Sequence, residues 1–486
     1  MLKLKHLRCL LLCAPQVVWA HGFGERYDLP VPMNWVIFAA CCVVLLSFLW
    51  TPFIQNKDLD VTRFTLNLQA QNPAFNPPGP LTAWTLILKV CAVALLLLTF
   101  LSAFFGSADP LMNFSPTFIW IVWWLGSSFA CMLFGNHWQH LDPWLCVYQS
   151  ARVAWLRVGN ASRQKPLLNW PLTWGRWPAC LSLLTWCGLE IIYPIAAMPH
   201  RLGWFIAAYS AITWLGMTLW GPSQWRSHAD GFTLYFELIG QARHMLMGHG
   251  KEDQATMSCP SQADISTVAL LIAIFTSVLF DGIHAGPAWL VFEKWMTHLA
   301  FMRSDTNGYW LGALGLIGLW LSLLLSYLLT CYATRCLLNF CERHASTAND
   351  VQVTTVELAN AFLASLLPIA MAYLLAHNFS SFFIQGQNII ALSSDPFGFG
   401  WNLLGTAQYY PDISLVDAKL TWYVATFSIV LGHVISVFMS HRVANFYAMR
   451  TRGVRLKAWV LNLPVTLVMI ALTAISLTII AEPLVN

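Results

Sequence analysis

Residues 266–284 read STVALLIAIFTSVLFDGIH, an apolar run that carries no charged side chain before Asp281. A helix needs about 20 apolar residues to cross the ~30 Å hydrocarbon core of a bilayer, and this run approaches that length. Backbone polar groups find no water partner in hydrocarbon, so such a run is expected to be helical. The stretch therefore predicts a membrane-spanning helix with an acid near one end.

Similar stretches recur along the 486-residue chain, which is 57% hydrophobic and only 10% charged. An ordinary soluble domain has about 25% charged residues. The sequence predicts an all-α fold, a polytopic transmembrane helix bundle of about ten spans that forms a single domain over residues 21–486. The spans are expected near 33–54, 81–105, 114–135, 177–196, 202–220, 266–283, 309–332, 357–379, 418–441 and 460–481.

The first twenty residues have the pattern of a cleaved signal peptide. Lys3, Lys5 and Arg8 precede a short apolar run, and small residues at 18 and 20 suit a signal peptidase. The alternative is an uncleaved anchor, but the apolar run is too short to span a bilayer. Removal of residues 1–20 makes His21 the first mature residue.

Lys and Arg residues set the expected orientation. They concentrate in the loops that lie inside if the mature N-terminus lies outside, as the positive-inside rule requires. The sequence thus predicts a multi-pass protein of a bacterial inner (plasma) membrane with both mature termini outside. The net charge of +4 is small and no run of like charges occurs, so nucleic acid is not an expected partner.

One inner segment differs from the spans. Residues 232–247 read FTLYFELIGQARHMLM and mix apolar and polar residues on a roughly helical period. This pattern predicts an interfacial amphipathic helix on the inner leaflet.

Ionisable side chains within spans are costly and are functional candidates by default. Glu190, Asp281, His377 and His433 are the ones that matter here. His284 follows Asp281 by three residues, so both share one helix face if the helix continues through Gly282. Such a pair can bind a divalent metal or act as acid and base. The alternative is a helix-end carboxylate that is hydrogen-bonded to its neighbours.

The mature N-terminus adds a further candidate ligand. The α-amine and imidazole of His21 can together chelate Cu(II), although a histidine can also follow the cleavage site by chance. His21, Asp281, His284 and His377 all fall on the predicted outer side, where they could converge on one divalent ion, copper or zinc. The outer loop from about 380 to 417, which contains Asp395, has the length of a lid or binding loop, or of a plain connector.

The sequence lacks a Walker A loop, a GxGxxG after a strand, a GxSxG elbow and an HExxH motif. These absences disfavour ATP-driven transport, dinucleotide chemistry and serine hydrolysis.

Seven blocks of sequence carry a family resemblance: HGFGERYDLPVP (21–32), DPW (142–144), GFTLYFELIG (231–240), SVLFDGIHAGPAW (277–289), LPIAMAYLLAHNFSSFFIQGQ (367–387), SDPFGFGWNLLGTAQYYPDISLVDA (394–418) and LGHVISV (431–437). In these blocks the chain resembles a bacterial family of fenitrothion hydrolase-like polytopic membrane proteins. The resemblance implies hydrolysis of an organophosphorus triester such as fenitrothion, with release of a nitrophenol and with a second membrane subunit as a partner. Leu374 stands where relatives tend to have a histidine.

The leading hypothesis is a membrane-embedded phosphotriesterase with an outward-facing, metal-activated water. His21, Asp281, His284 and His377 are the expected ligands, Asp281 and Asp395 the expected catalytic carboxylates, and an apolar substrate would arrive through the lipid. The first alternative is a non-enzymatic copper-handling or transport protein that uses the same histidines, with Glu190 and His433 as steps on a path. The second is a subunit that is inactive without its partner.

Overall fold

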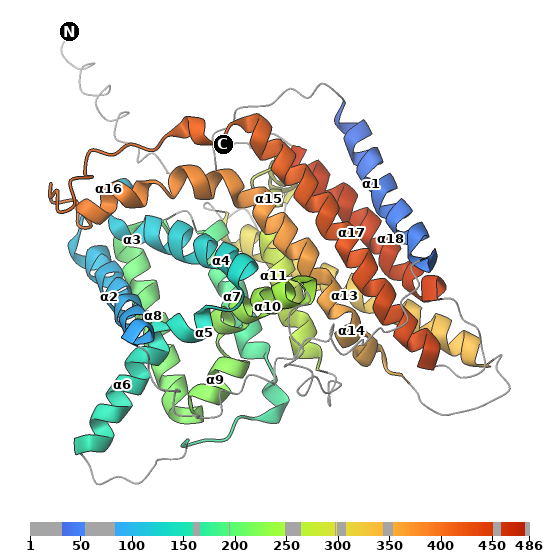
Figure 1. The fold of residues 1–486 in the computed structure, drawn as a ribbon, viewed down its shortest axis with the longest axis horizontal. Coiled ribbons are helices and arrows are strands. Elements are labelled where there is room, and N and C mark those ends of the chain that lie inside the picture. Colours follow the sequence, from blue (N-terminus) through green and yellow to red (C-terminus); the bar gives the residue numbers. More distant parts are fainter. Residues whose placement is uncertain are drawn as a thin grey trace.

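The structure is a computed structural model that describes residues 32–53, 83–158, 166–193, 195–247, 264–296, 298, 308–343, 353–450 and 458–481. Every regular element within these ranges is a helix (Figure 1). The all-α fold is therefore confirmed. The predicted signal peptide and His21 lie outside the described residues.

The helices have the following bounds: α1 (Met33–Trp50), η1 (Thr51–Phe53), α2 (Ala83–Phe105), η3 (Pro110–Met112), α3 (Phe114–Pro116), η4 (Thr117–Leu125), α4 (Gly126–Phe134), α5 (Trp138–Leu141), α6 (Pro143–Val158), η5 (Leu172–Trp174), α7 (Trp177–Ile191), α8 (Pro199–Trp220), α9 (Pro222–His228), α10 (Gly231–Met247), α11 (Ile265–His284), α12 (Pro287–Met296), α13 (Tyr309–Arg343), α14 (Thr355–Leu363), η7 (Ala364–Leu366), α15 (Leu367–Gln385), α16 (Asn388–Ser394), η8 (Ile413–Leu415), α17 (Ala418–Arg450) and α18 (Ala458–Ala481).

Nine helices among the described residues are long and apolar enough to cross a membrane. They match nine of the ten predicted spans, so the chain is a multi-pass membrane protein. The remaining prediction, 177–196, coincides with α7, which has only 15 residues and ends at Ile191. Pro194 follows closely, and a proline disfavours helical conformation in the residue before it. The sequence therefore overestimated the length of this helix.

Helix α10 lies inside the bundle instead of on its surface. Residues 229–240 are all buried, and α10 packs against α4, α5, α7, α9 and α15. Phe232, Tyr235, Phe236 and Ile239 form one buried face, and Leu234 and Leu238, on the opposite side of the helix, are buried as well. A helix that is apolar on several faces is best buried. The helix was correctly predicted, but its interfacial position was wrong.

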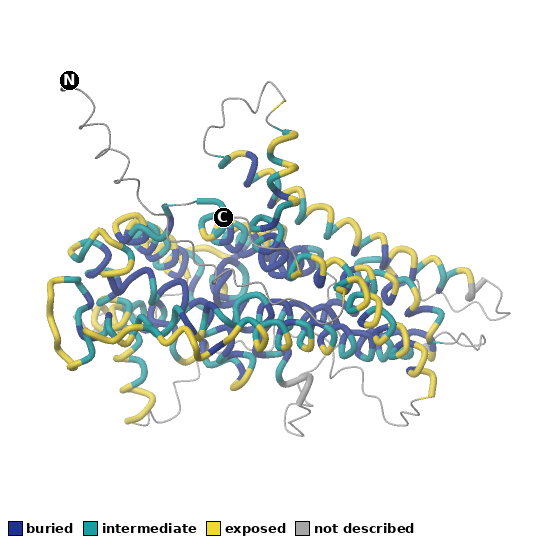
Figure 2. The backbone as a smooth tube through the Cα atoms, turned by 90° about the horizontal axis from the view of Figure 1, so that it is seen from above, coloured by how far each residue is buried: buried dark blue, intermediate teal, exposed yellow. Residues whose placement is uncertain are grey.

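The most enclosed span is α11, with 89% of its apolar window buried in protein. It packs against α7, α13, α14, α15 and α18. Exposed residues, yellow in Figure 2, lie on the peripheral helices. Their large exposed side chains are apolar on α1, α2 and α13, as contact with lipid tails requires; examples are Trp35, Phe38, Leu46, Ile87, Val90, Leu314, Leu321 and Leu325.

Candidate functional site

Asp281 and His377 lie side by side although they are far apart in the sequence. Asp281 lies in the last turn of α11, and His377 lies on α15, which packs against α11. The distance between Asp281 Oδ2 and His377 Nε2 is 2.9 Å, and the two side chains are only 16% and 11% exposed. A carboxylate at this distance orients an imidazole ring and stabilises its protonated form.

Tyr373 adds a hydroxyl beside this pair. It lies one turn before His377 on α15, and the two rings stack with centroids 6.2 Å apart. The side chain is 1% exposed, and its Oη has no hydrogen-bond partner within the described part of the chain. Buried polar atoms nearly always have a partner. The Tyr373 hydroxyl is thus available to a bound molecule, and it was not among the residues predicted from the sequence.

Gly282 makes room for that hydroxyl. A Cβ at position 282 would lie 2.5 Å from Tyr373 Oη and 2.7 Å from Ile479 Cγ2. Both distances are too short for real contacts, so three helices approach here only because residue 282 has no side chain. The glycine therefore fixes the position of Tyr373 relative to Asp281.

Gly282→Ala is expected to destabilise the protein by about 1–3 kcal/mol, as overpacking usually does. Gly318→Ala on α13 is the matched control, because nothing lies within 4 Å of its Cβ position; there, alanine should be neutral or stabilising by about 0.5–1 kcal/mol. Thermal unfolding of both variants in detergent measures the difference. Equal melting temperatures for the two variants would contradict the close packing around Gly282.

Glu190 is a second carboxylate in this region. It lies in the last turn of α7, and its Oε2 accepts a hydrogen bond of 3.1 Å from Trp124 Nε1. It is close enough to Asp281 for the two charges to interact, and it keeps exposed surface. We use the name Asp281 cluster for Glu190, Asp281, Tyr373 and His377.

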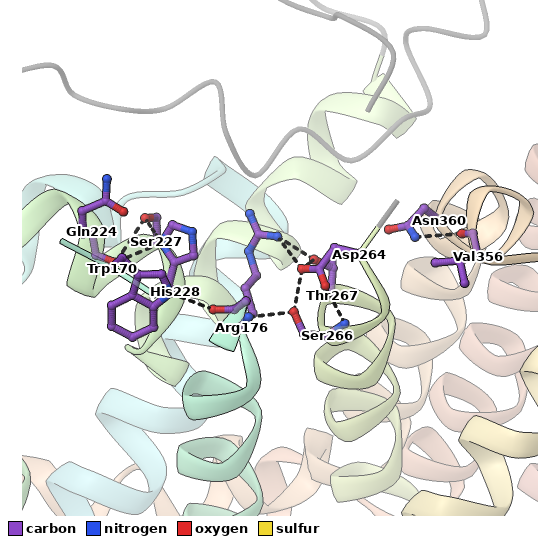
Figure 3. Close-up of polar contacts among 11 residues, drawn as sticks. Trp170, Arg176, Gln224, Ser227, His228, Asp264, Ser266, Thr267, Val356 and Asn360 are labelled. Carbon is purple, nitrogen blue, oxygen red and sulfur yellow. Dashed lines mark hydrogen bonds and ion pairs between the residues drawn. The ribbon is translucent and has the colours of Figure 1, made fainter. Parts of the chain in front are cut away.

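A polar contact at the other ends of α7 and α11 sets the relative positions of their carboxylates (Figure 3). The Arg176 backbone N–H donates to Ser266 Oγ at 2.7 Å, and its guanidinium donates to Thr267 Oγ1 at 2.6 Å and to Asp264 Oδ2 at 3.4 Å. Both helices begin at this contact and pack along each other. Glu190 and Asp281 therefore both lie near the far ends of adjacent helices.

His284 shares α11 with Asp281, because the helix continues through Gly282 to His284. The prediction that Asp281 and His284 share one helix face depended on this continuation of the helix. The His284 ring packs against aromatic neighbours, with its centroid 5.0 Å from Trp289 and 5.5 Å from Phe280.

The described residues contain no group of three or more His, Cys, Asp or Glu side chains placed to hold a metal ion. The predicted metal centre would need His21, which lies outside the described residues. The described candidate ligands, Asp281, His284 and His377, do not by themselves form such a group.

Asp395 holds its own loop together. Its carboxylate accepts backbone hydrogen bonds from Phe399, Gly400 and Trp401 at 2.9, 2.6 and 3.1 Å. The loop follows α16 and lies at the left of Figure 1, away from α11. The backbone N–H of Phe114, the first residue of α3, donates a hydrogen bond to the backbone oxygen of Pro396 in this loop. The structure does not bring Asp395 together with Asp281 and His377.

Comparisons of the chain with known protein families, with curated proteins and with solved structures gave no match.

Proposed function

We propose that this chain is a membrane-embedded hydrolase of apolar organophosphorus triesters and that Asp281 and His377 activate the attacking water. The observation that carries the proposal is the 2.9 Å contact between these two side chains inside a membrane bundle. A buried acid and imidazole are costly in hydrocarbon and mark functional sites. The substrate class rests on the resemblance to fenitrothion hydrolases.

The chemistry follows from this 2.9 Å contact. With the proton of the neutral imidazole on Nε2, facing the Asp281 carboxylate, the lone pair is on Nδ1 and can take a proton from water. The water oxygen then forms a bond to phosphorus, and the bond from phosphorus to the aryl oxygen breaks. The proton held by His377 passes to the departing nitrophenolate. Asp281 stabilises the transient imidazolium, as the acid of a catalytic triad does.

Tyr373, a neighbour of the pair, completes the proposed site. The unpartnered hydroxyl of Tyr373 is a donor for the phosphoryl oxygen or sulfur, on which charge develops during attack. An apolar triester dissolves in the lipid and would reach the bundle from the membrane.

A divalent ion is the second route to the same reaction. In that proposal Asp281, His284, His377 and His21 would hold copper or zinc, which would supply a water of lowered pKa. We derive no step through it, because the described ligands alone do not form such a centre.

Removal of metal separates the two routes. We expect the purified protein to retain its rate of nitrophenol release after treatment with a chelator and dialysis, because the acid–base pair needs no ion. Metal content should be measured on the same sample. Loss of the rate, its restoration by zinc or copper, and a matching loss in His21→Ala would instead establish the metal route.

Transport is the second function predicted from the sequence, with Glu190 and His433 as steps. His433 lies on α17 and is 1% exposed. An uptake assay for copper in vesicles separates the alternatives, since a transporter moves the ion without hydrolysing an ester. The inner bacterial membrane, outward termini and a second subunit remain part of the proposal.

A further inference from the structure

Buried polar side chains follow one face of α18 and the facing side of α17. On α18, the buried face includes Asn462, Thr466, Met469, Thr473 and Ser476. On α17, the residues His433, Ser436 and Ser440 are each 1% exposed or less. We call these eight residues the polar seam.

The two faces of the polar seam meet each other and α15. Ser436 Oγ lies 3.4 Å from Met469 Sδ, and it also donates to the backbone oxygen of Ser365 just before α15. One turn earlier on α17, a Cβ at Gly432 would lie 2.6 Å from Ala372 Cβ on α15. The seam is thus enclosed by three tightly packed helices.

Some polar atoms in the seam are satisfied by their own helix. Thr466 donates to the Asn462 oxygen at 3.0 Å, and Thr473 donates to the Met469 oxygen at 2.8 Å. Small hydroxyl residues bonded in this way are common where membrane helices pack. These residues alone would indicate only a packing interface.

Other atoms in the seam have no partner within the described residues. They are His433 Nε2, Asn462 Nδ2, Asn462 Oδ1 and Ser476 Oγ, and all belong to side chains that are 1% exposed or less. His433 Nδ1, by contrast, bonds to the Ile429 oxygen at 2.8 Å. An unsatisfied buried polar group destabilises the folded protein, and bound water is the usual partner of such groups.

The seam ends at the Asp281 cluster. Asn462 and Ser476 are separated by about 21 Å along α18 at the ~1.5 Å rise of a helix. Ile479 lies one turn beyond Ser476 and flanks Gly282 together with the Tyr373 hydroxyl. An unpartnered hydroxyl therefore lies at the end of a line of unpartnered polar atoms.

We propose that the polar seam holds a file of bound water molecules that leads from Asn462 past His433 and Ser476 to Tyr373. Its use as a supply of water or a path for protons to the Asp281–His377 pair rests on the proposed function. The presence of water in the seam does not depend on that function.

Hydroxyl-radical footprinting tests the proposal, because X-ray pulses generate radicals from bound water and oxidise nearby methionines. Met469 lies in the seam and is 1% exposed, while Met439 on α17 is 5% exposed and packs against Ala364 and Ile435. In protein held in lipid nanodiscs, we expect Met469 to be oxidised several-fold faster than Met439. Equal or slower oxidation of Met469 would overturn the proposal.

Variants of the seam sharpen the result. Asn462→Leu combined with Ser476→Ala removes polar groups without changing the fold of α18, so we expect Met469 oxidation to fall to the Met439 rate. Thr478→Ala is the matched control on the exposed face of α18 and should leave Met469 oxidation unchanged. Undiminished oxidation of Met469 in the double variant would contradict the water file. The footprinting experiment contains no substrate, so its result does not depend on whether the protein hydrolyses a triester.

Discussion

Replacing His377 with glutamine is expected to lower the rate of nitrophenol release from fenitrothion by about 10²- to 10⁴-fold, the usual contribution of a general base. Glutamine keeps a polar side chain that can bond to Asp281, but it cannot take a proton from water. The effect should appear in kcat, because His377 is proposed to act in the chemical step. The measurement is steady-state hydrolysis by the purified protein in lipid vesicles.

Three further variants check this result. Asp281→Asn should cause a similar loss, and the double variant should be little worse than either single one, because residues that act as a unit are not additive. His200→Gln should retain the full rate, since His200 is exposed on α8 and its Nε2 accepts a hydrogen bond from Trp204. A normal rate in His377→Gln would remove the pair from the mechanism.

Replacing Arg226 with methionine is expected to destabilise the protein by about 3–5 kcal/mol, the usual cost of leaving a buried charge without its partner. Arg226 Nε lies 3.2 Å from Asp142 Oδ2, and these side chains are only 10% and 2% exposed. Asp142 lies between α5 and α6, outside the nine candidate spans. Burial raises the pKa of its carboxyl to about 6 even with Arg226 present to oppose the rise.

The pH dependence of this loss has a definite sign. Because the folded-state pKa of Asp142 exceeds its ordinary value of about 3.9, the stability contributed by the protonated acid is present at low pH. It is lost as the pH rises through about 6. Without Arg226 the penalty for the ionised form grows, so the deficit of Arg226→Met should be larger at about pH 8 than at about pH 5.

Unfolding in a denaturing detergent, followed at both pH values, measures the Arg226 deficit. The double variant Arg226→Met with Asp142→Leu is the control and should recover most of the lost stability, because it removes the carboxylate that Arg226 contacts. An Arg226→Met variant as stable as the unchanged protein at the higher pH would show that the pair contributes nothing.

The sequence was most informative where apolar length alone decides the structure. Nine spans could be predicted because hydrocarbon requires long apolar helices, whereas the end of α7 depended on the effect of Pro194. The position of α10 could not be predicted, because an alternation of apolar and polar residues does not show which other helices surround it. Glu237 is such a polar residue, and it is only 8% exposed inside the protein.

The sequence predicted most residues of the candidate site, but it did not predict how they are arranged in space. Asp281, Glu190 and His377 were selected because ionisable groups are rare in spans, but the sequence does not show that α11 packs on α15. Tyr373 was missed because a tyrosine in a span is ordinary. Its position four residues before His377, on the same helix face, was the available signal. Asp395 was selected for its loop, and its three backbone hydrogen bonds could not be seen in the sequence.

Hydrolysis of fenitrothion in ¹⁸O-water by the purified chain alone, in lipid vesicles, tests the central proposal most directly. We expect nitrophenol to be released well above the protein-free rate, with ¹⁸O incorporated into the phosphorus product, and we expect Asp281→Asn to abolish both signals. Release no faster than in empty vesicles, or equal release by Asp281→Asn, would contradict the assignment of Asp281 and His377 as the water-activating pair.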